Sequence, residues 1–256
     1  MKEEVKYIHN TDVHNLVAPG IVVPFLIEIF KPKSVIDIGC GIGTWLSVFK
    51  EKGITDILGV DGNYVDVKLL SGFIKPDEFK AMDLARPFDL KRKFDLAICL
   101  EVAEHLSHDN APDLVETITH HADIVIFGAA IPNQWGQNHL NEQWPEYWVK
   151  LFSDHGYTCY DILRPLVWDN SLVDWWYRQN MLVFSKNLLT EYTPATGYLS
   201  VIHPIHFNQK IEYIDMLNKK VQFLTSELNK WKDGNGGIKR YGQNFLKALK
   251  KKFTKL

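Results

Sequence analysis

Short runs of apolar residues recur along the first 186 positions of the chain, each bounded by polar residues, glycine or proline. Runs of five to eight residues with few charges are typical of strands that are covered on both faces of a sheet. Amphipathic segments such as 21–30, 44–52 and 112–121 predict helices between most of these strands. The pattern therefore predicts an α/β fold with seven strands, at 34–38, 56–61, 78–84, 93–100, 123–128, 157–164 and 180–185.

The sixth and seventh predicted strands differ from the others, because no helix-length segment separates them. Antiparallel neighbours need no crossover helix, so these two strands are expected to pair as a hairpin with a wide loop. The strand pattern ends near residue 187. We therefore expect a sheet domain with an N-terminal cap over residues 1–187, followed by a linker and a C-terminal helical extension over residues 188–256.

The extension has a different pattern, in which apolar residues recur at alternating spacings of three and four. They form a heptad seam of about three repeats over residues 211–231, made of Ile214, Leu217, Val221, Leu224, Leu228 and Trp231. This seam predicts either a coiled-coil homodimer or a helix packed on the parent domain. A glycine-rich break at 233–237 precedes a basic amphipathic stretch, which favours a peripheral membrane contact or, alternatively, a solvated tail.

A glycine turn follows the first predicted strand. Gly39, Gly41 and Gly43 stand at alternate positions, and a helix begins at Thr44. A strand, a glycine turn and a helix bring bare backbone close to a nucleotide-like cofactor, because no Cβ obstructs the approach. The free N–H groups of the helix N-terminus then face an anionic part of the ligand.

Acidic residues end the next two predicted strands. Asp61 lies 18 residues beyond Gly43 in the sequence, about where a carboxylate accepts hydrogen bonds from ribose hydroxyls. Asp83 is placed to accept the amino proton of an adenine, with Met82 and Leu84 lining the ring. These positions predict a cofactor that carries an adenosine.

The spacing of the turn distinguishes between two such cofactors. A dinucleotide fingerprint is G-x-G-x-x-G, whereas this chain has G-x-G-x-G followed by the bulky Thr44 and Trp45. Asp37 precedes the turn and would repel a pyrophosphate, but it suits the ammonium of a methionine moiety. The turn therefore favours S-adenosylmethionine over a nicotinamide dinucleotide.

Polar residues also follow the fourth and fifth predicted strands, at the edge where ligands bind in open α/β sheets. Glu101, Glu104 and His105 directly follow the fourth strand. The long segment 129–148 follows the fifth strand, and loops in this location often carry substrate contacts. From these two regions and from the loop before the last strand, we expect substrate contacts by His139, Asn141, Glu142, Trp144 and Arg178.

The amino-acid composition indicates which classes of binding partner and which cellular compartment to expect for this protein. The formal net charge of −2 gives no sign of a nucleic-acid partner, and the three cysteines are too few for a disulfide framework. The sequence has no run of 18 apolar residues, and its first residues lack the apolar core of a signal peptide. These features favour a cytoplasmic protein.

The motifs V-I-D-I-G-C-G-I-G-T-W-L, G-V-D-G, M-D-L and E-V-A-E-H-L, in this order, closely resemble class I S-adenosylmethionine-dependent methyltransferases. The resemblance covers residues 20–186 and implies a Rossmann-like sheet of order 3-2-1-4-5-7-6 with an antiparallel last strand and helices on both faces. It also implies that Glu101 and Val102 lie along the cofactor. The run H-L-N-E-Q-W-P-E-Y-W resembles a subgroup associated with bacterial surface polysaccharides and other small molecules.

Methyl transfer from a sulfonium is a one-step in-line displacement, so a base is needed only for a neutral acceptor. The candidates for this base are His105, Glu104 and His139. For a phosphate-like acceptor, Arg178 and His139 would bind the anion instead. The sequence shows no histidine and carboxylate cluster with the spacing of a metal site, so no metal is expected.

These observations predict an O-methyltransferase that acts on a sugar or phosphoryl-type group of a capsule or surface-polysaccharide precursor. The alternatives are a methyltransferase for another small metabolite, an RNA or protein methyltransferase, and a non-catalytic scaffold that binds the cofactor. The sequence names neither the acceptor nor the oligomeric state.

Overall fold

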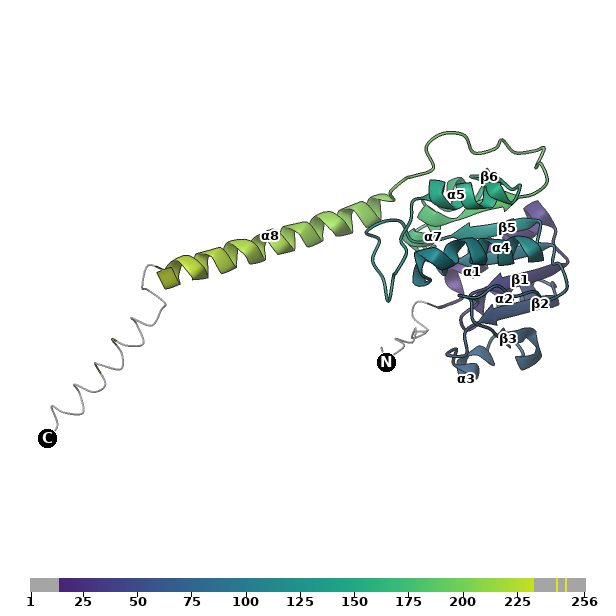
Figure 1. Ribbon diagram of the computed structural model, residues 1–256, viewed down its shortest axis with the longest axis horizontal. Coiled ribbons are helices and arrows are strands. Elements are labelled where there is room, and N and C mark those ends of the chain that lie inside the picture. Colours follow the sequence, from purple (N-terminus) through teal and green to yellow (C-terminus); the bar gives the residue numbers. More distant parts are fainter. Residues whose placement is uncertain (1–13, 233–242, 244–246, 248–256) are drawn as a thin grey trace. The chain divides into compact units, whose positions relative to one another are not determined.

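The computed structural model describes residues 14–232 together with residues 243 and 247 (Figure 1). The chain divides into two compact units, Met1–His203 and Pro204–Leu256. The first unit therefore extends beyond residue 187, where the sequence pattern placed the boundary. Leu199 explains part of the difference, because it is buried and its carbonyl accepts a hydrogen bond of 2.8 Å from Nη1 of Arg164.

The first unit is built on a seven-stranded sheet of order β3-β2-β1-β4-β5-β7-β6, which confirms the predicted fold. Strands β1 to β5 run parallel to one another, and β7 runs antiparallel to both β5 and β6. The strands are β1 (Ser34–Ile38), β2 (Asp56–Asp61), β3 (Phe79–Ala81), β4 (Leu96–Leu100), β5 (Ile124–Gly128), β6 (Thr158–Tyr160) and β7 (Leu182–Ser185).

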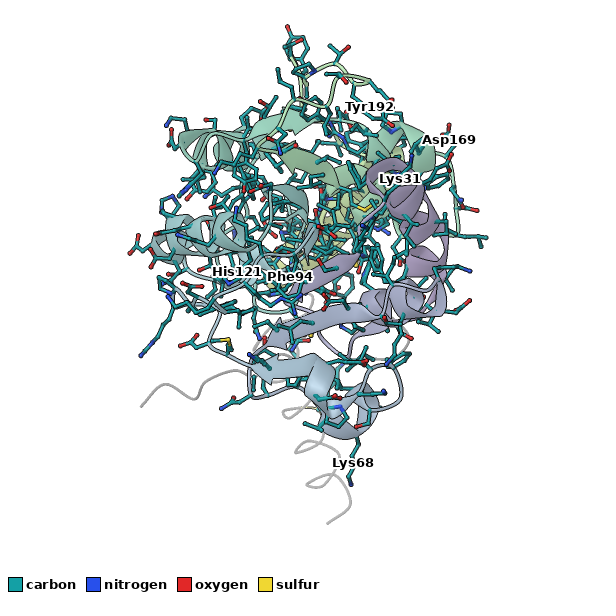
Figure 2. The ribbon with its side chains drawn as sticks, turned by 90° about the vertical axis from the view of Figure 1, so that its right-hand side faces the viewer. Lys31, Lys68, Phe94, His121, Asp169 and Tyr192 are labelled. Atoms are coloured by element: carbon teal, nitrogen blue, oxygen red, sulfur yellow. The ribbon has the colours of Figure 1, made fainter. Side chains whose placement is uncertain are left out.

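Alternate residues of the central strands enter two different cores, one on each face of the sheet. Along β1, Val35 belongs to one core and Ile36 to the other, and Leu96 and Ala97 divide in the same way along β4. The continuous apolar runs in the sequence arise because both faces of the sheet are covered. Figure 2 shows side chains filling the space on both sides of the strands.

Helices cover each core. On one face lie α1 (Val17–Phe30), α2 (Thr44–Glu51) and α6 (Leu163–Val167), and on the other lie α4 (Ala111–His121) and α5 (Pro145–Asp154). Two further helices, α3 (Val67–Leu70) and α7 (Trp175–Asn180), are short, as are the 3-10 turns Pro76–Glu78, Ala103–His105 and His108–Asn110.

The segment between β6 and β7 corrects one prediction. The two strands pair antiparallel as expected, but the connection contains α6 and α7 rather than a loop without helices. The buried guanidinium of Arg164 explains the early end of β6. It bonds the Asp161 carboxylate at 2.6 and 2.8 Å and the carbonyl of Leu199, which fixes a turn where the sequence suggested more strand.

The second unit contains helix α8 (Pro204–Lys232). The predicted seam lies on this helix, and its described members are exposed, from Leu217 at 38% to Val221 at 60%. The basic stretch after residue 238 lies outside the described residues apart from positions 243 and 247. Within the described part of the chain, no helix combines the length and apolar character needed to cross a membrane.

A stability test follows from the aromatic cluster that joins α5 to the sheet. The ring of Phe152 is fully buried and stacks on Phe184 of β7, with 4.1 Å between ring centroids. Phe152→Ala should lower the free energy of unfolding by about 3–5 kcal/mol, because it leaves a cavity beside a close-packed sheet. Urea denaturation measures the change. The exposed Leu172→Ala should stay within about 0.5 kcal/mol of the parent protein, and equal losses in both variants would contradict this account of the core.

Candidate active site

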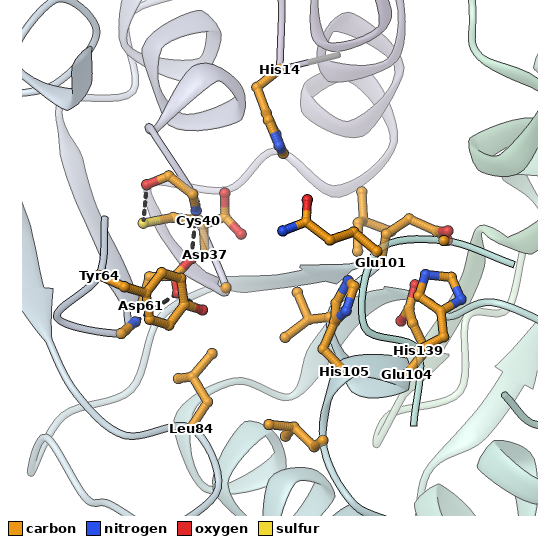
Figure 3. Close-up of a pocket in the computed structure, with 18 of the residues that line it drawn as sticks. His14, Asp37, Cys40, Asp61, Tyr64, Leu84, Glu101, Glu104, His105 and His139 are labelled. Carbon is orange, nitrogen blue, oxygen red and sulfur yellow. Dashed lines mark hydrogen bonds between the residues drawn. The ribbon is translucent and has the colours of Figure 1, made fainter. Parts of the chain in front are cut away.

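A cavity of about 610 Å³ lies at the carboxyl ends of the parallel strands (Figure 3). Its lining comes from the segments that follow β1, β2, β3 and β4, from residues 134–139 after β5, and from residues 175–177 in α7. The cavity is therefore where ligands bind in open α/β sheets. Its size is within the range of small-molecule sites.

The glycine turn forms one wall of the cavity. Gly39 has a φ of +89°, and a Cβ at this position would lie 2.2 Å from Cγ2 of Val102, so only glycine fits. The N–H groups of Gly39 and Cys40 donate to the Val60 carbonyl, which ties the turn to β2. Gly43 precedes α2 and does not line the cavity, unlike the other predicted cofactor residues.

The Asp61 carboxylate joins the glycine turn to the end of β2. One oxygen accepts from the Gly41 N–H at 2.7 Å, and the other accepts from the Gly62 N–H at 2.6 Å and the Tyr64 hydroxyl at 2.7 Å. Burial raises the pKa of Asp61, and these hydrogen bonds oppose the rise. The carboxylate is therefore fixed before any ligand binds, and its predicted contact with ribose stays a prediction.

Asp37 is the second buried carboxylate of this wall. It is 3% exposed, and its Oδ2 has no hydrogen-bond partner among the described residues. Burial raises the pKa of Asp37, and the charge of Asp61 raises it further. A buried carboxylate oxygen without a partner is costly, and a cationic ligand group relieves that cost.

The charge of the whole lining points to the same ligand class. Five carboxylates line the cavity, and none of its described lining residues is a lysine or an arginine. Such a cavity repels a pyrophosphate and attracts a cation. The carboxylates come from Asp37, Asp61, Asp83, Glu101 and Glu104.

Glu101 occupies a strained position directly after β4. Its φ is +55°, which is rare for a residue with a side chain and is often found at functional sites. Its carboxylate oxygens accept hydrogen bonds of 2.9 Å each, from the amide groups of Gln134 and Asn180. Burial raises the pKa of Glu101, and the two amides oppose the rise. No local sequence pattern indicated either amide, because Gln134 follows β5 and Asn180 precedes β7.

Glu104, His105 and His139 gather at the far side of the cavity. Burial raises the pKa of Glu104, and the charge of Glu101 adds to this. Burial, together with the nearby His139, lowers the pKa of His105 to about 4. An imidazole with so low a pKa is a weak general base at neutral pH.

The same three residues correct the view that the chain has no metal-type cluster. Each offers a ligand atom, and these atoms lie within 4.8 Å of one another. No local sequence pattern indicated this cluster, because His139 lies 35 residues after Glu104 in the chain. Hydrogen bonds from the N–H groups of Leu140 and Asn141 to the Glu104 carbonyl, at 2.7 and 3.0 Å, bring the two segments together.

Of the predicted substrate residues, the structure brings only His139 to the cavity. Arg178 is buried, and its Nη1 donates to the Trp168 carbonyl at 3.0 Å. The Glu142 carboxylate binds Nδ1 of His139, Asn141 is buried, and Trp144 precedes α5. None of these four residues lines the cavity. The segment after residue 139 folds back toward β5, since the N–H of Gln143 donates to the Ala130 carbonyl at 3.2 Å.

The structure adds lining residues that the sequence analysis did not assign to the cavity individually. Aromatic density in 165–179 was a usable signal for α7, whereas nothing in the sequence distinguished Tyr64 or the glutamines. The added polar and aromatic side chains include His14, Asn63, Tyr64, Gln134, Trp135, Gln137, Trp175, Trp176 and Tyr177.

Comparisons with known proteins agree with this geometry. A family model described as a methyltransferase domain matches residues 17–185, and the chain therefore belongs to that family. No curated protein sequence matches the chain significantly.

Similar solved structures include three methyltransferase folds. The methyltransferase domain of a bacterial Hen1 protein is 22% identical over 67% of this chain and 97% of its own, with a TM-score of 0.49. Human N-acetylserotonin methyltransferase, solved with S-adenosylmethionine, is 14% identical over 70% of this chain and 54% of its own, with a TM-score of 0.50. A putative O-methyltransferase from Nostoc punctiforme is 16% identical over 66% and 56%, with a TM-score of 0.48.

The protein is an S-adenosylmethionine-dependent methyltransferase with the class I fold. The cavity fits this cofactor, whose sulfonium and ammonium groups are both cationic, because its lining is acidic and Asp37 presents an unpartnered oxygen. The bound cofactor supplies an activated methyl group. Among the chain's own residues, the turn at Gly39 and the carboxylates of Asp37 and Asp61 line the cavity and would hold this group.

The unpartnered Asp37 carboxylate generates a binding test. Asp37→Asn should weaken S-adenosylmethionine binding about 10- to 100-fold, because a hydrogen bond to a charged group contributes about 1.5–3 kcal/mol. Isothermal titration calorimetry measures the affinity. Asp109→Asn, whose side chain is 99% exposed and lies outside the cavity, should bind like the parent protein. Unchanged affinity in Asp37→Asn would show that this carboxylate does not hold the cofactor.

Proposed function

We propose that this enzyme transfers the methyl group of S-adenosylmethionine to a hydroxyl oxygen of a sugar, in a precursor of a capsule or other surface polysaccharide. The observation that carries the proposal is the set of aromatic side chains in the same cavity as the cofactor residues. Trp135, Trp175, Trp176 and Tyr177 line the cavity from two separate segments.

The aromatic side chains differ from ordinary core residues in their exposure. Trp135 is 53% exposed, and Trp175 and Trp176 are partly exposed with ring centroids 5.6 Å apart in an edge-to-face arrangement. Exposed aromatic faces at a cavity favour a ligand with flat apolar surfaces. A sugar ring has such faces, and its hydroxyl groups suit the nearby amides of Gln134 and Gln137.

The charge of the lining favours a hydroxyl over a phosphoryl acceptor. None of the described lining residues is a lysine or arginine, and Arg178 is engaged elsewhere. A phosphoryl acceptor would place its anionic oxygens among five carboxylates, with no lysine or arginine in the described lining to offset the repulsion. We therefore propose a sugar hydroxyl, rather than a phosphoryl oxygen, as the acceptor.

The reaction is a single displacement. The acceptor oxygen forms a bond to the methyl carbon, the carbon–sulfur bond breaks with its electron pair moving to sulfur, and the hydroxyl proton is released. Holding oxygen, carbon and sulfur in line can contribute about 7–11 kcal/mol. The cavity walls therefore act mainly by positioning the two substrates.

An acceptor panel tests the proposal. The full chain is incubated with S-adenosylmethionine and nucleotide-activated sugars, short glycans, amines, proteins and RNA, and methylated products are detected by mass spectrometry. The expected product is a methyl ether on a sugar. Methylation of amines, protein or RNA alone would overturn the proposal, as would cofactor binding without turnover on any acceptor.

Two tryptophans of one loop provide a matched pair for this assay. Trp135→Ala should raise the KM for the sugar about 3- to 10-fold with little change in cofactor affinity, because stacking contributes about 0.5–1.5 kcal/mol. Trp144→Ala removes a tryptophan that does not line the cavity and should leave KM unchanged. Equal effects in the two variants would place the acceptor elsewhere.

We also propose that the enzyme is cytoplasmic, since its activated-sugar acceptors and its cofactor are metabolites of that compartment. A homodimer through residues 211–231 and a membrane contact through the basic C-terminal stretch stay predictions. The exposed apolar seam of α8 supports the first of them, because a surface helix that keeps this spacing favours pairing with a partner helix.

The seam generates a test of oligomeric state. Leu217→Asp combined with Leu224→Asp should convert a dimer into a monomer, because both side chains lie on the seam and a buried unpaired charge is costly. Sedimentation equilibrium measures the mass of each protein. The control Asn218→Asp adds a charge to the same helix off the seam and should leave the mass unchanged. A monomeric parent protein would contradict the prediction.

A further inference from the structure

Glu104 is a fully buried carboxylate at the edge of the cavity. Neither of its oxygens has a well-formed hydrogen bond among the described residues, and the backbone N–H groups of Glu104 and Ala130 only partly oppose the rise in its pKa. The carboxylate of Glu101, three residues earlier in the chain, places a further negative charge nearby. Buried groups of this kind require an explanation, because each costs about 1–3 kcal/mol or more when charged.

Two histidines lie beside this carboxylate. One ligand atom each from Glu104, His105 and His139 lies within 4.8 Å of the others, and the two imidazole centroids are 5.0 Å apart. Figure 3 shows the three side chains meeting at one end of the cavity. A metal ion binds nitrogen and carboxylate oxygen ligands at about 2.0–2.2 Å, so small side-chain rotations bring all three within reach of one ion.

The surroundings of His139 hold its ring in place. Nδ1 lies 2.8 Å from Oε1 of Glu142, and the same carboxylate accepts the N–H groups of Asn133 and Trp135 at 2.6 and 2.7 Å. A carboxylate that accepts Nδ1–H leaves the lone pair on Nε2, which is the arrangement found behind metal-binding histidines. Glu142 therefore orients this imidazole from outside the cavity.

Gly136 keeps space open beside that nitrogen. A Cβ at position 136 would lie 2.1 Å from Nε2 of His139, so any other residue would block the ring. The backbone on both sides of Gly136 is also unusual, since Trp135 and Asn138 have φ values of +61° and +60°. A segment under this strain is maintained where the surrounding structure requires it.

We propose that Glu104, His105 and His139 form a binding site for a divalent transition-metal ion such as Mn²⁺, Co²⁺ or Zn²⁺. Two imidazoles and one carboxylate suit these ions and leave further coordination positions open. The cation also offsets the buried charge of Glu104 and its repulsion from Glu101. Because the three residues line the same cavity as the cofactor residues, the open positions face the reaction space.

The role of the ion rests on the proposed function. With a sugar hydroxyl as a further ligand, the ion lowers the pKa of that hydroxyl, and its proton passes to solvent. The oxygen then attacks the methyl carbon, and the carbon–sulfur electron pair moves to sulfur, so atoms and charge balance without a protein base. His105 and His139 are then ligands rather than the general bases that the sequence analysis considered.

Metal binding can be measured without any acceptor. The untagged full chain is treated with a chelator, desalted and titrated with Mn²⁺ by electron paramagnetic resonance, and with Co²⁺ by visible absorption. One ion should bind per chain, and Glu104→Gln and His139→Asn should each remove the site. Glu142→Gln should weaken binding about 10- to 100-fold, because the positioning carboxylate is lost.

A matched control and a fold check accompany the titration. His155→Asn removes an exposed histidine outside the cavity and should bind like the parent protein. A far-UV circular dichroism spectrum of Glu104→Gln that matches the spectrum of the parent protein shows that the variant is folded. The absence of stoichiometric binding in the parent protein overturns the proposal, as does binding that Glu104→Gln and His139→Asn leave intact.

Two outcomes separate this proposal from the proposed function. If metal binds at these residues but no sugar is methylated, the acceptor assignment fails and the site stands. If sugar methylation proceeds unchanged after chelation and in His139→Asn, the metal proposal fails and the acceptor assignment stands.

Discussion

Buried negative charge is the constraint on which the rest of this structure depends. The parallel strands deliver Asp37, Asp61, Glu101 and Glu104 to one cavity, and the described lining supplies no lysine or arginine against them. Hydrogen bonds satisfy Asp61 and Glu101, whereas Asp37 and Glu104 keep oxygens without partners. Buried carboxylate oxygens without partners are tolerated where a bound ligand supplies the missing partner, so the cavity favours cationic ligands. Asp37 lies beside the glycine turn, and Glu104 lies beside His105 and His139. The simplest way to compensate both buried charges is a separate cationic group at each carboxylate.

The antiparallel β7 has a direct consequence for this site. Because β7 lies between β5 and β6, the end of α7 reaches the edge where β4 and β5 terminate. Asn180 therefore donates to Glu101 at 2.9 Å, and the same amide lies 3.0 Å from the side-chain oxygen of Gln134. Three strand ends are joined through one network of side-chain amides. Such a network holds the strained backbone at Glu101 and fixes the far wall of the cavity.

The acceptor side of the cavity is made of loops, and the cofactor side is made of strand ends. Residues 134–139 and 175–177 carry the aromatic rings and the second histidine, and they are positioned by Glu142, by the Glu104 carbonyl and by α7. Loops of this kind vary without disturbing the sheet. This division explains why the class of enzyme follows from the strands and the turn, whereas the acceptor is argued from the aromatic and polar lining.

The sequence by itself determined the sheet and most of the cofactor wall, because these depend on local patterns. Apolar runs predicted the seven strands, and the residues directly after each strand predicted Asp37, Asp61, Glu101 and Glu104 at one edge. Tertiary structure alone decided which loop residues reach the cavity. Arg178 and Trp144 are close in sequence to lining residues but turn away, while Gln134 and Asn180 meet at Glu101 from distant positions. The physical reason is that parallel strands fix where their ends lie, whereas the path of a long loop is set by hydrogen bonds between residues far apart in the chain.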